Sequence, residues 1–285
     1  MKAAPFKYIR AESLEHSLEI LAAYGDEARV LAGGQSLLPS LSLRLSEPAV
    51  LLDINRVAAL SCEPVVTDAH VRLPALMRHA QLLASPIIEA HLSLLHQAAP
   101  WIAHPGIRHR GTVCGSLAVG DPASELPACA VAAGAVLILQ SHARGTRAVP
   151  AREFYLGLLH NACAPDELIV AVEFPRMDHL RTTFREVARR RGDYAMVGLA
   201  GVARAGGRGL SQPGLTFFGI GDRPLQASGI CAAIEAADTA EQAVTLALEA
   251  YERDISPSAD LWCSSQAKKH IGRYLLEEAV HELFQ

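Results

Sequence analysis

The stretch VLAGGQSLLP, residues 30–39, places two adjacent glycines between an apolar run and a leucine-rich segment. Glycine costs conformational entropy on folding and adds nothing to a core, so a pair of glycines beside a strand needs a structural reason. The pattern predicts a short buried strand over residues 28–31 that runs into a glycine turn. Something must approach this backbone so closely that no side chain is tolerated.

The segments on both sides of this turn predict a small strand–helix–strand unit that ends near residue 55. A helix is expected over residues 13–25, because Ser13 suits an N-cap and leucines recur at helical spacing. After the glycines, Ser36 can cap a second helical segment. The apolar run at residues 49–54 predicts the second buried strand.

The rest of the chain divides into two further parts, giving expected domains at residues 1–57, 58–175 and 176–285. In the second part we expect strands at 70–75 and 167–175, a helix at 76–84, one long helical pattern at 86–99, a loop-rich stretch at 101–128 and a buried element at 128–139. In the third part, strand-like segments precede two helical patterns. Strands followed by helices favour an α+β layer with an antiparallel sheet.

Composition excludes several classes of protein. The 285 residues are 50% hydrophobic and carry a net charge of −4, which gives no support to a nucleic-acid or anionic-membrane surface. The longest apolar stretch, residues 128–139, is too short to span a bilayer, and the first residues lack a secretory signal. We therefore expect a cytoplasmic protein. None of the six cysteines forms a CxxC pair, which argues against a zinc or iron–sulfur site in this chain.

Common catalytic and nucleotide-binding motifs are also absent from the sequence. No GxGxxG follows a strand, no lysine follows a glycine loop as in a P-loop, and neither HExxH nor GxSxG occurs. His104 and His109 flank a glycine loop without a carboxylate or cysteine at ligand spacing. We expect them to be hydrogen-bonded or solvated, and we assign no catalytic or metal-ligating residue.

Two separate glycine loops remain, AGGQS at residues 32–36 and TVCGS at residues 112–116. Successive backbone N–H groups in such turns can converge into a nest that binds phosphate. Either loop alone could equally be a plain tight turn. Two nests folded together would suit a pyrophosphate such as that of FAD.

Three segments resemble the FAD-carrying medium subunits of molybdenum hydroxylases, the family that includes the flavoprotein subunits of carbon monoxide, nicotine and xanthine dehydrogenases. They are RVLAGGQSLLPSLSLRL, PGIRHRGTVCGSLAVGDPASELPA and FREVARRRGDYAMVG, and the tail DLWCSSQAKKHIGRYLL is a looser match. The resemblance implies an α+β fold, with a two-part FAD-binding domain of the PCMH type before a smaller α+β domain that contains an antiparallel sheet and helices.

The resemblance also implies a division of labour among subunits. A large subunit would hold molybdopterin and a small one two [2Fe–2S] clusters, possibly in a dimer of heterotrimers. This chain would pass electrons from the clusters through FAD to an external acceptor. Substrate and acceptor are not readable from this sequence. A stand-alone flavoenzyme of the same FAD-binding superfamily is the alternative, and an assembly subunit that has lost its cofactor is a third possibility.

The site residues implied by the resemblance come from all three parts of the chain. The resemblance implies two clamps on the pyrophosphate, one formed by Ala32, Gly33, Gly34, Gln35 and Ser36 and the other by Thr112, Val113, Cys114, Gly115 and Ser116. It implies a ribose contact at Glu125, with Ile102 and Tyr194 flanking the isoalloxazine ring. Arg29 is expected to place a charge near the phosphates. Gln35 offers no imidazole for a covalent link, so FAD should bind noncovalently. Cys114 could be inert or a thiol that senses the flavin. The run Arg189–Arg191 could be solvated or form a positive edge.

Overall fold

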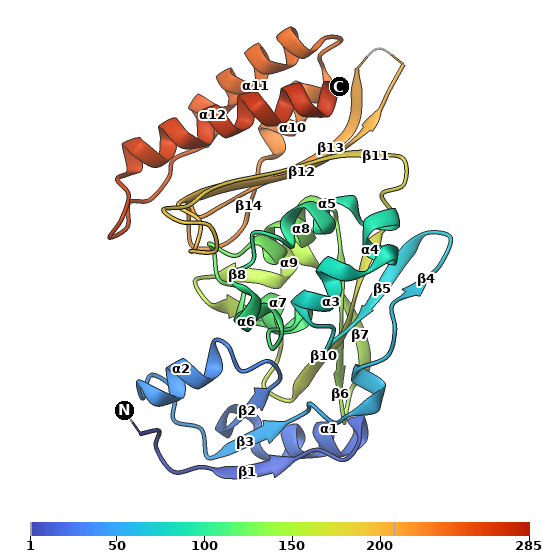
Figure 1. The fold of residues 1–285 in the computed structure, drawn as a ribbon, viewed down its shortest axis with the longest axis vertical. Helices are drawn as coiled ribbons and strands as arrows, with labels where there is room; N and C mark the ends of the chain where they lie inside the picture. The colour runs from blue at the N-terminus through green and yellow to red at the C-terminus, as the bar shows by residue number, and fades with distance from the viewer. Residues whose placement is uncertain (1, 208) are drawn as a thin grey trace.

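The N-terminal residues form a small parallel sheet in the order β1-β3-β2, at the bottom of Figure 1. The computed structural model describes residues 2–207 and 209–285. The elements are β1 (Lys7–Arg10), α1 (Leu14–Tyr24), the 3-10 turn η1 (Gly25–Glu27), β2 (Ala28–Leu31), α2 (Leu37–Ser42), β3 (Val50–Asp53) and a second 3-10 turn, η2 (Ala58–Leu60). The predicted strand–helix–strand unit is therefore confirmed as β2-α2-β3.

Local chemistry explains where α1 begins and ends. Ser13 accepts a hydrogen bond from the backbone N–H of His16 at 3.0 Å, and Gly25 leaves the helix with φ +46°. Two expectations were incomplete. The strand β1 was not predicted, because KYIR is largely exposed and shows no apolar run. The strand β2 is only partly buried, with Ala28 as its buried residue.

The middle of the molecule is an antiparallel sheet in the order β4-β5-β10-β6-β7. The strands predicted at 70–75 and 167–175 are confirmed as its adjacent members β5 and β10. The elements of this part are β4 (Val65–Val66), β5 (His70–Pro74), α3 (His79–Ala84), α4 (Pro86–His91), α5 (Ser93–Ala98), α6 (Pro105–Arg108), α7 (Val113–Val119), α8 (Glu125–Ala132), β6 (Val136–Ser141), β7 (Gly145–Pro150), α9 (Ala151–Phe154), the two-stranded β8 (Tyr155–Gly157) and β9 (His160–Asn161), and β10 (Glu167–Pro175).

Three expectations for this part were wrong in detail. The single helical pattern at 86–99 is two helices, because Leu92 (φ −133°, ψ 55°) interrupts α4 and α5. The stretch at 101–128 is not mainly loop, since α6, α7 and the start of α8 lie in it. The apolar run at 128–139 is divided between α8 and β6, and Gly134 (φ +68°) makes the turn between them.

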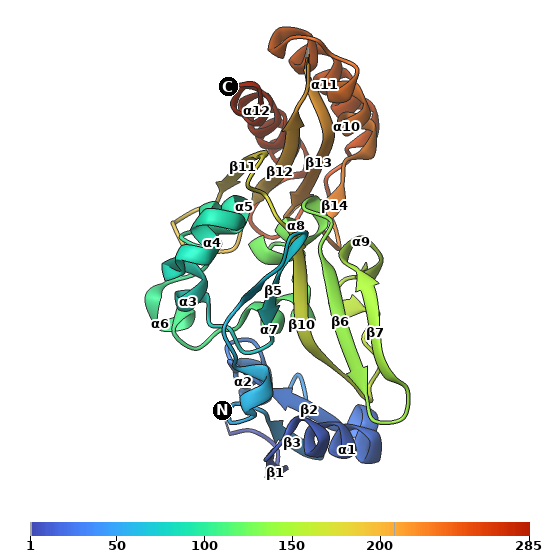
Figure 2. The same cartoon turned by 90° about the vertical axis from the view of Figure 1, so that its right-hand side faces the viewer.

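The C-terminal part is a four-stranded antiparallel sheet, β11-β12-β13-β14, covered on its outer face by helices (Figures 1 and 2). Both predicted helices are present, and α10 is an additional one. The elements are β11 (Leu180–Val187), β12 (Val197–Ala205), β13 (Leu210–Phe218), β14 (Leu225–Gln226), α10 (Ser228–Glu235), α11 (Ala240–Asp254) and α12 (Ser265–Phe284). In the part of the chain that the structure describes, no helix is long and apolar enough to cross a membrane.

The inner face of the C-terminal sheet belongs to the main hydrophobic core. Phe184, Ala200 and Phe218 from that face are buried in one cluster with residues of the middle part, whereas Leu199 and Phe217 on the outer face pack with α10, α11 and α12. Helices α5 and α8 lie between the two sheets and contact the C-terminal one. The sheet is thus fixed to the middle part by side-chain packing rather than by a linker alone.

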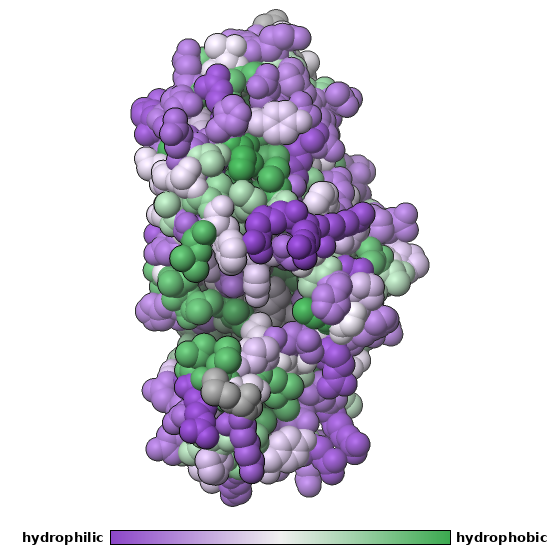
Figure 3. Space-filling view, turned by 60° about the vertical axis from the view of Figure 1, so that its left-hand side comes forward, coloured by the Kyte–Doolittle hydropathy of each residue, from purple (hydrophilic) through white to green (hydrophobic). Residues whose placement is uncertain are grey.

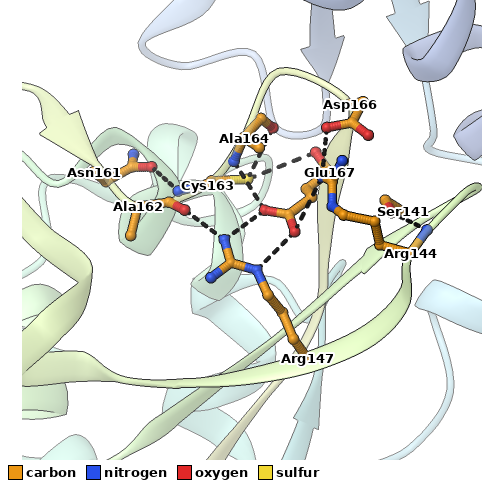
Figure 4. A network of polar contacts seen from close by, with 9 residues as sticks. All are labelled: Ser141, Arg144, Arg147, Asn161, Ala162, Cys163, Ala164, Asp166 and Glu167. Carbon is orange, nitrogen blue, oxygen red and sulfur yellow. Dashed lines mark hydrogen bonds and ion pairs between the residues drawn. The ribbon is translucent and has the colours of Figure 1, made fainter.

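A polar network anchors the loop before β10 to its neighbours (Figure 4). Arg147 on β7 forms two 2.7 Å hydrogen bonds with the carboxylate of Glu167, whose side chain is 2% exposed. Arg147 also donates to the carbonyl of Ala162. In the same loop, Asn161 donates to the carbonyl of Ala118 at 2.7 Å. The network therefore fixes the C-terminal end of α7, the helix that follows the second glycine loop.

Candidate functional site

The two glycine loops lie against each other. A Cβ built on Gly33 would be 2.5 Å from the carbonyl oxygen of Arg110 and 2.7 Å from Cα of Gly111. Both are backbone atoms, which cannot move aside as a flexible side chain can. The close approach inferred from the sequence is therefore made by the chain just before the second loop, and Gly33 is the residue that permits it.

A side-chain bridge that the sequence did not reveal connects the same two loops. Asn55, which follows β3, donates from Nδ2 to the carbonyl of Ala32 at 2.8 Å. Its Oδ1 accepts from Arg78 Nη2 at 2.6 Å, and Arg78 Nη1 donates to the carbonyl of Arg110. Arg78 thus bridges both loops through hydrogen bonds from a charged donor, the stronger kind.

His79 holds the start of the second loop through hydrogen bonds to its backbone. Its backbone N–H donates to the carbonyl of Gly111 at 3.0 Å, and its Nε2 lies 2.9 Å from the carbonyl oxygen of Thr112. Burial lowers the pKa of His79 to about 4, so the ring is neutral near pH 7. With a carbonyl as its partner, Nε2 carries the proton and donates. Gly111 is needed here too, because a Cβ on it would lie 3.0 Å from the His79 ring.

The first loop holds more free backbone donors than the second. Among the hydrogen bonds between described residues, none has its donor at the backbone N–H of residues 33–36. In the second loop, the N–H groups of Val113, Gly115 and Ser116 are already bound, to Met77, to Thr112 Oγ1 and to the Thr112 carbonyl. Among the described residues, nothing accepts from the N–H groups of Thr112 and Cys114 in that loop. A group of unpaired N–H donors suits an anionic ligand or ordered water.

The structure also brings Ile102 close to the turn that contains Tyr194. A Cβ on Gly192 (φ +88°) would lie 2.7 Å from the carbonyl oxygen of Ala103, the residue after Ile102. Arg108 donates to the carbonyls of both Ile102 and Ala103, at 2.8 and 2.9 Å. Ile102 is buried, whereas Tyr194 is 67% exposed. The two chain segments that carry Ile102 and Tyr194 are therefore adjacent at Ala103 and Gly192.

The basic run beside Tyr194 is partly held by aromatic rings. The guanidinium of Arg189 lies over the ring of Trp262, 3.9 Å from its centroid, and that of Arg191 lies 5.7 Å from the Trp101 centroid. Such cation–π contacts fix the direction of a charge while leaving it accessible. Arg190 is exposed. The run is thus ordered at the surface beside Tyr194, which a purely solvated run would not be.

Glu125 is the first residue of α8 and is 8% exposed. Burial and the nearby carboxylate of Asp121 raise its pKa to about 7. Asp121 begins the loop before α8, and the next residue, Pro122, accepts a hydrogen bond from the Gly219 N–H at 2.7 Å. This bond ties the end of β13 to the acidic loop. The Tyr194 side chain as a whole is exposed, but neighbouring protein desolvates its hydroxyl, and this desolvation, followed by the charges of Asp121 and Glu125, raises its pKa. These three residues therefore share one region.

Three of the predicted site residues are placed less directly. Arg29 donates to the carbonyls of Asp26 and Ala28, which lie at the start of β2, the end of the strand that is away from the first loop. Gln35 folds back on its own loop and donates to the Gly33 carbonyl at 3.1 Å. Ser36 occupies the N-cap position of α2 but its hydroxyl forms no capping bond to the described residues.

Cys114 is buried in the core, 4% exposed, and burial raises the pKa of its thiol to about 12. Of its two interpretations, inert packing is the one this environment favours, because the reactive thiolate is not formed near neutral pH. The side chain of Cys62 is exposed.

We expect a thiol reagent at pH 8 to modify one cysteine quickly in the folded chain, and Cys62→Ser to remove that fast phase. Mass spectrometry of the modified peptides would identify the site. Rapid modification of Cys114 without unfolding would contradict this assignment. Cys163 serves as an internal control, since burial also raises the pKa of its thiol to about 12.

The face of the molecule that carries α2 and the turn after β11 is hollowed at mid-height (Figure 3).

Both glycine loops were identified from the sequence, but Asn55, Arg78 and His79 were missed. Arg78 and His79 appeared to lie inside a helix, yet Arg78 is the extended N-cap residue of α3 (φ −75°, ψ 149°). Asn55 at the end of the first unit was a visible signal, because polar residues after parallel strands often line binding sites.

Comparison with known proteins agrees with this geometry. Residues 4–177 match the model described as the FAD binding domain in molybdopterin dehydrogenase, and residues 182–283 that of the CO dehydrogenase flavoprotein C-terminal domain. The chain is 36% identical over 282 residues to the 6-hydroxypseudooxynicotine dehydrogenase complex subunit alpha of Paenarthrobacter nicotinovorans, covering 98% of this chain and 95% of that protein. It is 37% identical over 227 residues to the caffeine dehydrogenase subunit beta of Pseudomonas sp. (strain CBB1), covering 79% and 77%.

A solved structure of similar fold is that of carbon monoxide dehydrogenase from Hydrogenophaga pseudoflava, which lacks the Mo-pyranopterin moiety of its cofactor. The TM-score is 0.95 at 31% identity, over 99% of this chain and 98% of that one. These matches confirm the resemblance, the fold class and the presence of an FAD-binding domain. The chain belongs to the family of FAD-binding medium subunits of molybdenum hydroxylases, as an oxidoreductase component.

Proposed function

We propose that this chain holds FAD noncovalently between its two glycine loops and passes electrons from a partner's [2Fe–2S] clusters to an external acceptor. One observation carries the proposal: Gly33 is pressed against the backbone of Arg110 and Gly111 beside a row of N–H groups, residues 33–36, that bind no described residue. This cradle fits a diphosphate, which offers several acceptor oxygens and negative charge. Both loops lie within residues 4–177, the part of the chain that matches the FAD binding domain.

The remaining site residues fit the other parts of FAD. Ala32 to Ser36, with Thr112 to Ser116, would hold the pyrophosphate, and within the second loop Thr112 and Cys114 supply the free N–H groups. Glu125 would contact a ribose hydroxyl, and Ile102 and Tyr194 would flank the isoalloxazine ring. Bound there, FAD supplies the capacity to accept and release electrons. The residues of this chain bind and orient it and keep a cationic edge, Arg189 and Arg191, beside Tyr194.

The partners in this proposal are a molybdopterin-binding large subunit and a small [2Fe–2S] subunit, with a dimer of heterotrimers as the assembly. Support comes from the relatives, whose names describe them as a subunit of a dehydrogenase complex or a medium chain. The described residues contain no group of three His, Cys, Asp or Glu side chains that could hold a metal. The cytoplasm is the proposed location, since the six cysteines are free thiols.

The test is reduction of the flavin with and without partners. The purified chain should be yellow and carry about one FAD, and substrates of the complex should bleach it only when both partner subunits are present. Substrates would be chosen from N-heterocycles, aldehydes, purines and CO, and absorbance at the flavin band would be followed. Bleaching of the isolated chain by a substrate would instead support a stand-alone flavoenzyme. A colourless chain that takes up no added FAD would refute the proposal.

A further inference from the structure

Two buried carboxyl groups lie between α8 and β11. Glu186 on β11 is 7% exposed and Glu125 on α8 is 8% exposed. Both side-chain oxygens of Glu186 are buried and have no hydrogen-bond partner within residues 2–207 and 209–285. Glu125 and Glu186 each act electrostatically on the thiol of Cys129, one turn further along α8, and Glu125 acts on Glu186. The two carboxyl groups therefore share one buried region.

Strand alternation explains why Glu186 points inward. Phe184, two residues earlier, stacks on Phe218 of the inner face with ring centroids 5.7 Å apart. Glu186 lies opposite Gly198 in the sheet, and the space of the missing Gly198 side chain is filled by the Phe218 ring. Arg185 points to the other face, where it pairs with Glu278 and Glu282 of α12 at 3.5 and 3.1 Å. The adjacent arginine therefore does not pair with Glu186, and a negative charge on Glu186 would not be balanced by it.

Among the described residues, no cation forms an ion pair with either carboxyl group. Lys268, which donates to the carbonyl of Gly219 beside the acidic loop, pairs instead with Asp260 at 2.7 Å. On the α8 side the titratable groups are Asp121, Cys129 and Tyr194, none of which carries positive charge. From α5, which packs on β11, the titratable side chain is His96. Within the described ranges, no ion pair includes Glu125 or Glu186, and no metal-binding group of three side chains includes them.

An isolated carboxylate in such a place is unfavourable unless a cation, a metal or hydrogen-bond donors balance it. Since the described residues supply neither a cation nor a hydrogen-bond donor to Glu186, the way they leave to remove its charge is to bind a proton. We propose that Glu125 and Glu186 are a coupled pair of buried carboxyl groups that hold protons near neutral pH, and that binding of FAD at Glu125 is thereby linked to proton binding inside the protein. The part concerning FAD rests on the proposed function, and the pair itself does not.

The direction of the pH effect follows from burial. Burial, and then the carboxylate of Glu125, raises the pKa of Glu186 to about 8, and burial together with the carboxylate of Asp121 raises that of Glu125 to about 7. The titration of Glu186 is therefore coupled to that of Glu125. In the unfolded chain both return to ordinary values near 4.5. Between about pH 4.5 and pH 8 the folded chain binds more protons than the unfolded chain. The free energy of unfolding therefore falls as pH rises through this range and levels off above about pH 8.

The first experiment is chemical unfolding of the full chain from pH 5.5 to 9, for the wild type and Glu186→Gln. We expect the variant to lose most of the pH dependence, and at pH 8.5 to have an unfolding equilibrium constant at least ~10-fold below the wild type, since each pKa unit corresponds to a factor of ten. The matched control Glu19→Gln, at an exposed position on α1, should keep the wild-type slope. Equal slopes for Glu186→Gln and the wild type would overturn the proposal.

Infrared spectroscopy of the wild-type chain provides a readout that does not depend on a variant folding. A protonated carboxyl carbonyl band should be present at pH 7, disappear by pH 9.5, and lose intensity in Glu186→Gln or Glu125→Gln, since each variant removes one of the two protonated groups. Its absence at pH 7 would overturn the proposal. Neither readout needs FAD, so a chain that shows the band yet binds no FAD would contradict only the proposed function.

A third measurement addresses the link to FAD. Calorimetric titration with FAD in buffers of different ionisation enthalpy should show proton uptake between pH 7 and 8, because a cofactor bound against Glu125 excludes water from that carboxyl group, and desolvation favours its protonated form. The uptake should vanish in Glu186→Gln. Binding without proton exchange in the wild type would refute the link between the pair and FAD.

Discussion

Gly33→Val should abolish FAD binding, reducing the flavin content per folded chain to less than about a tenth. The reason is steric: the first carbon of any side chain would lie 2.5 Å from the Arg110 carbonyl oxygen, where only backbone could move. The valine would push the loops apart and dislocate the N–H groups of residues 33–36. From the sequence, a side chain at position 33 would be expected to occupy the place of the phosphate. The structure shows that it would collide with the backbone just before the second loop.

The ratio of flavin absorbance to protein measures this loss, and far-ultraviolet circular dichroism reports whether the chain is folded. Gly207→Val is the matched control, because a Cβ there meets nothing within 4 Å and the backbone is not in the left-handed region. It should retain flavin. A folded Gly33→Val chain with normal flavin content would show that the loops do not clamp the cofactor.

Arg78→Met should weaken FAD binding at least tenfold. Methionine keeps much of the aliphatic length but removes the donors that hold Asn55 and the Arg110 carbonyl, and with them the bridge between the loops. Hydrogen bonds from a charged donor contribute roughly 1.5–3 kcal/mol each, and 1.4 kcal/mol corresponds to a factor of ten. Part of the loss should appear as FAD affinity, because the loops must be held together to bind one diphosphate.

Fluorescence titration of the flavin-free chain with FAD would give the affinity. Arg152→Met is a suitable comparison, since Arg152 is exposed and pairs only with its neighbour Glu153 at 3.3 Å among the described residues. Removing it should leave FAD affinity within a factor of two. If both variants bound FAD equally well, the bridge would have no part in positioning the loops.

Local patterns were sufficient for much of the fold. The capped helix at 13–25, the strand–helix–strand unit and the strands at 70–75 and 167–175 all show clear periodicity or apolar runs, and the structure contains each. Both glycine loops were found because glycine and hydroxyl residues cluster there. Helices α6 and α7 were missed, since four and seven residues are too few to display a helical period.

Long-range contacts could not be predicted in this way. Nothing near Gly33 in the sequence indicates that Arg110 and Gly111 will face it, and the bridge by Asn55 and Arg78 joins three separated segments. Glu186 illustrates the same limit. In an alternating strand a glutamate usually faces solvent, and only the packing of α5 and α8 on that face makes it buried.

The core shared by the middle part and the inner face of the C-terminal sheet constrains how this chain can be recombined. Phe184, Ala200 and Phe218 are complementary in shape to α5 and α8, not to other residues of their own sheet alone. A chimera that takes its last hundred or so residues from a relative would leave overlaps and voids at that seam unless both helices came from the same donor. Exchange of C-terminal segments between relatives would therefore succeed most readily when α5 and α8 are transferred with them.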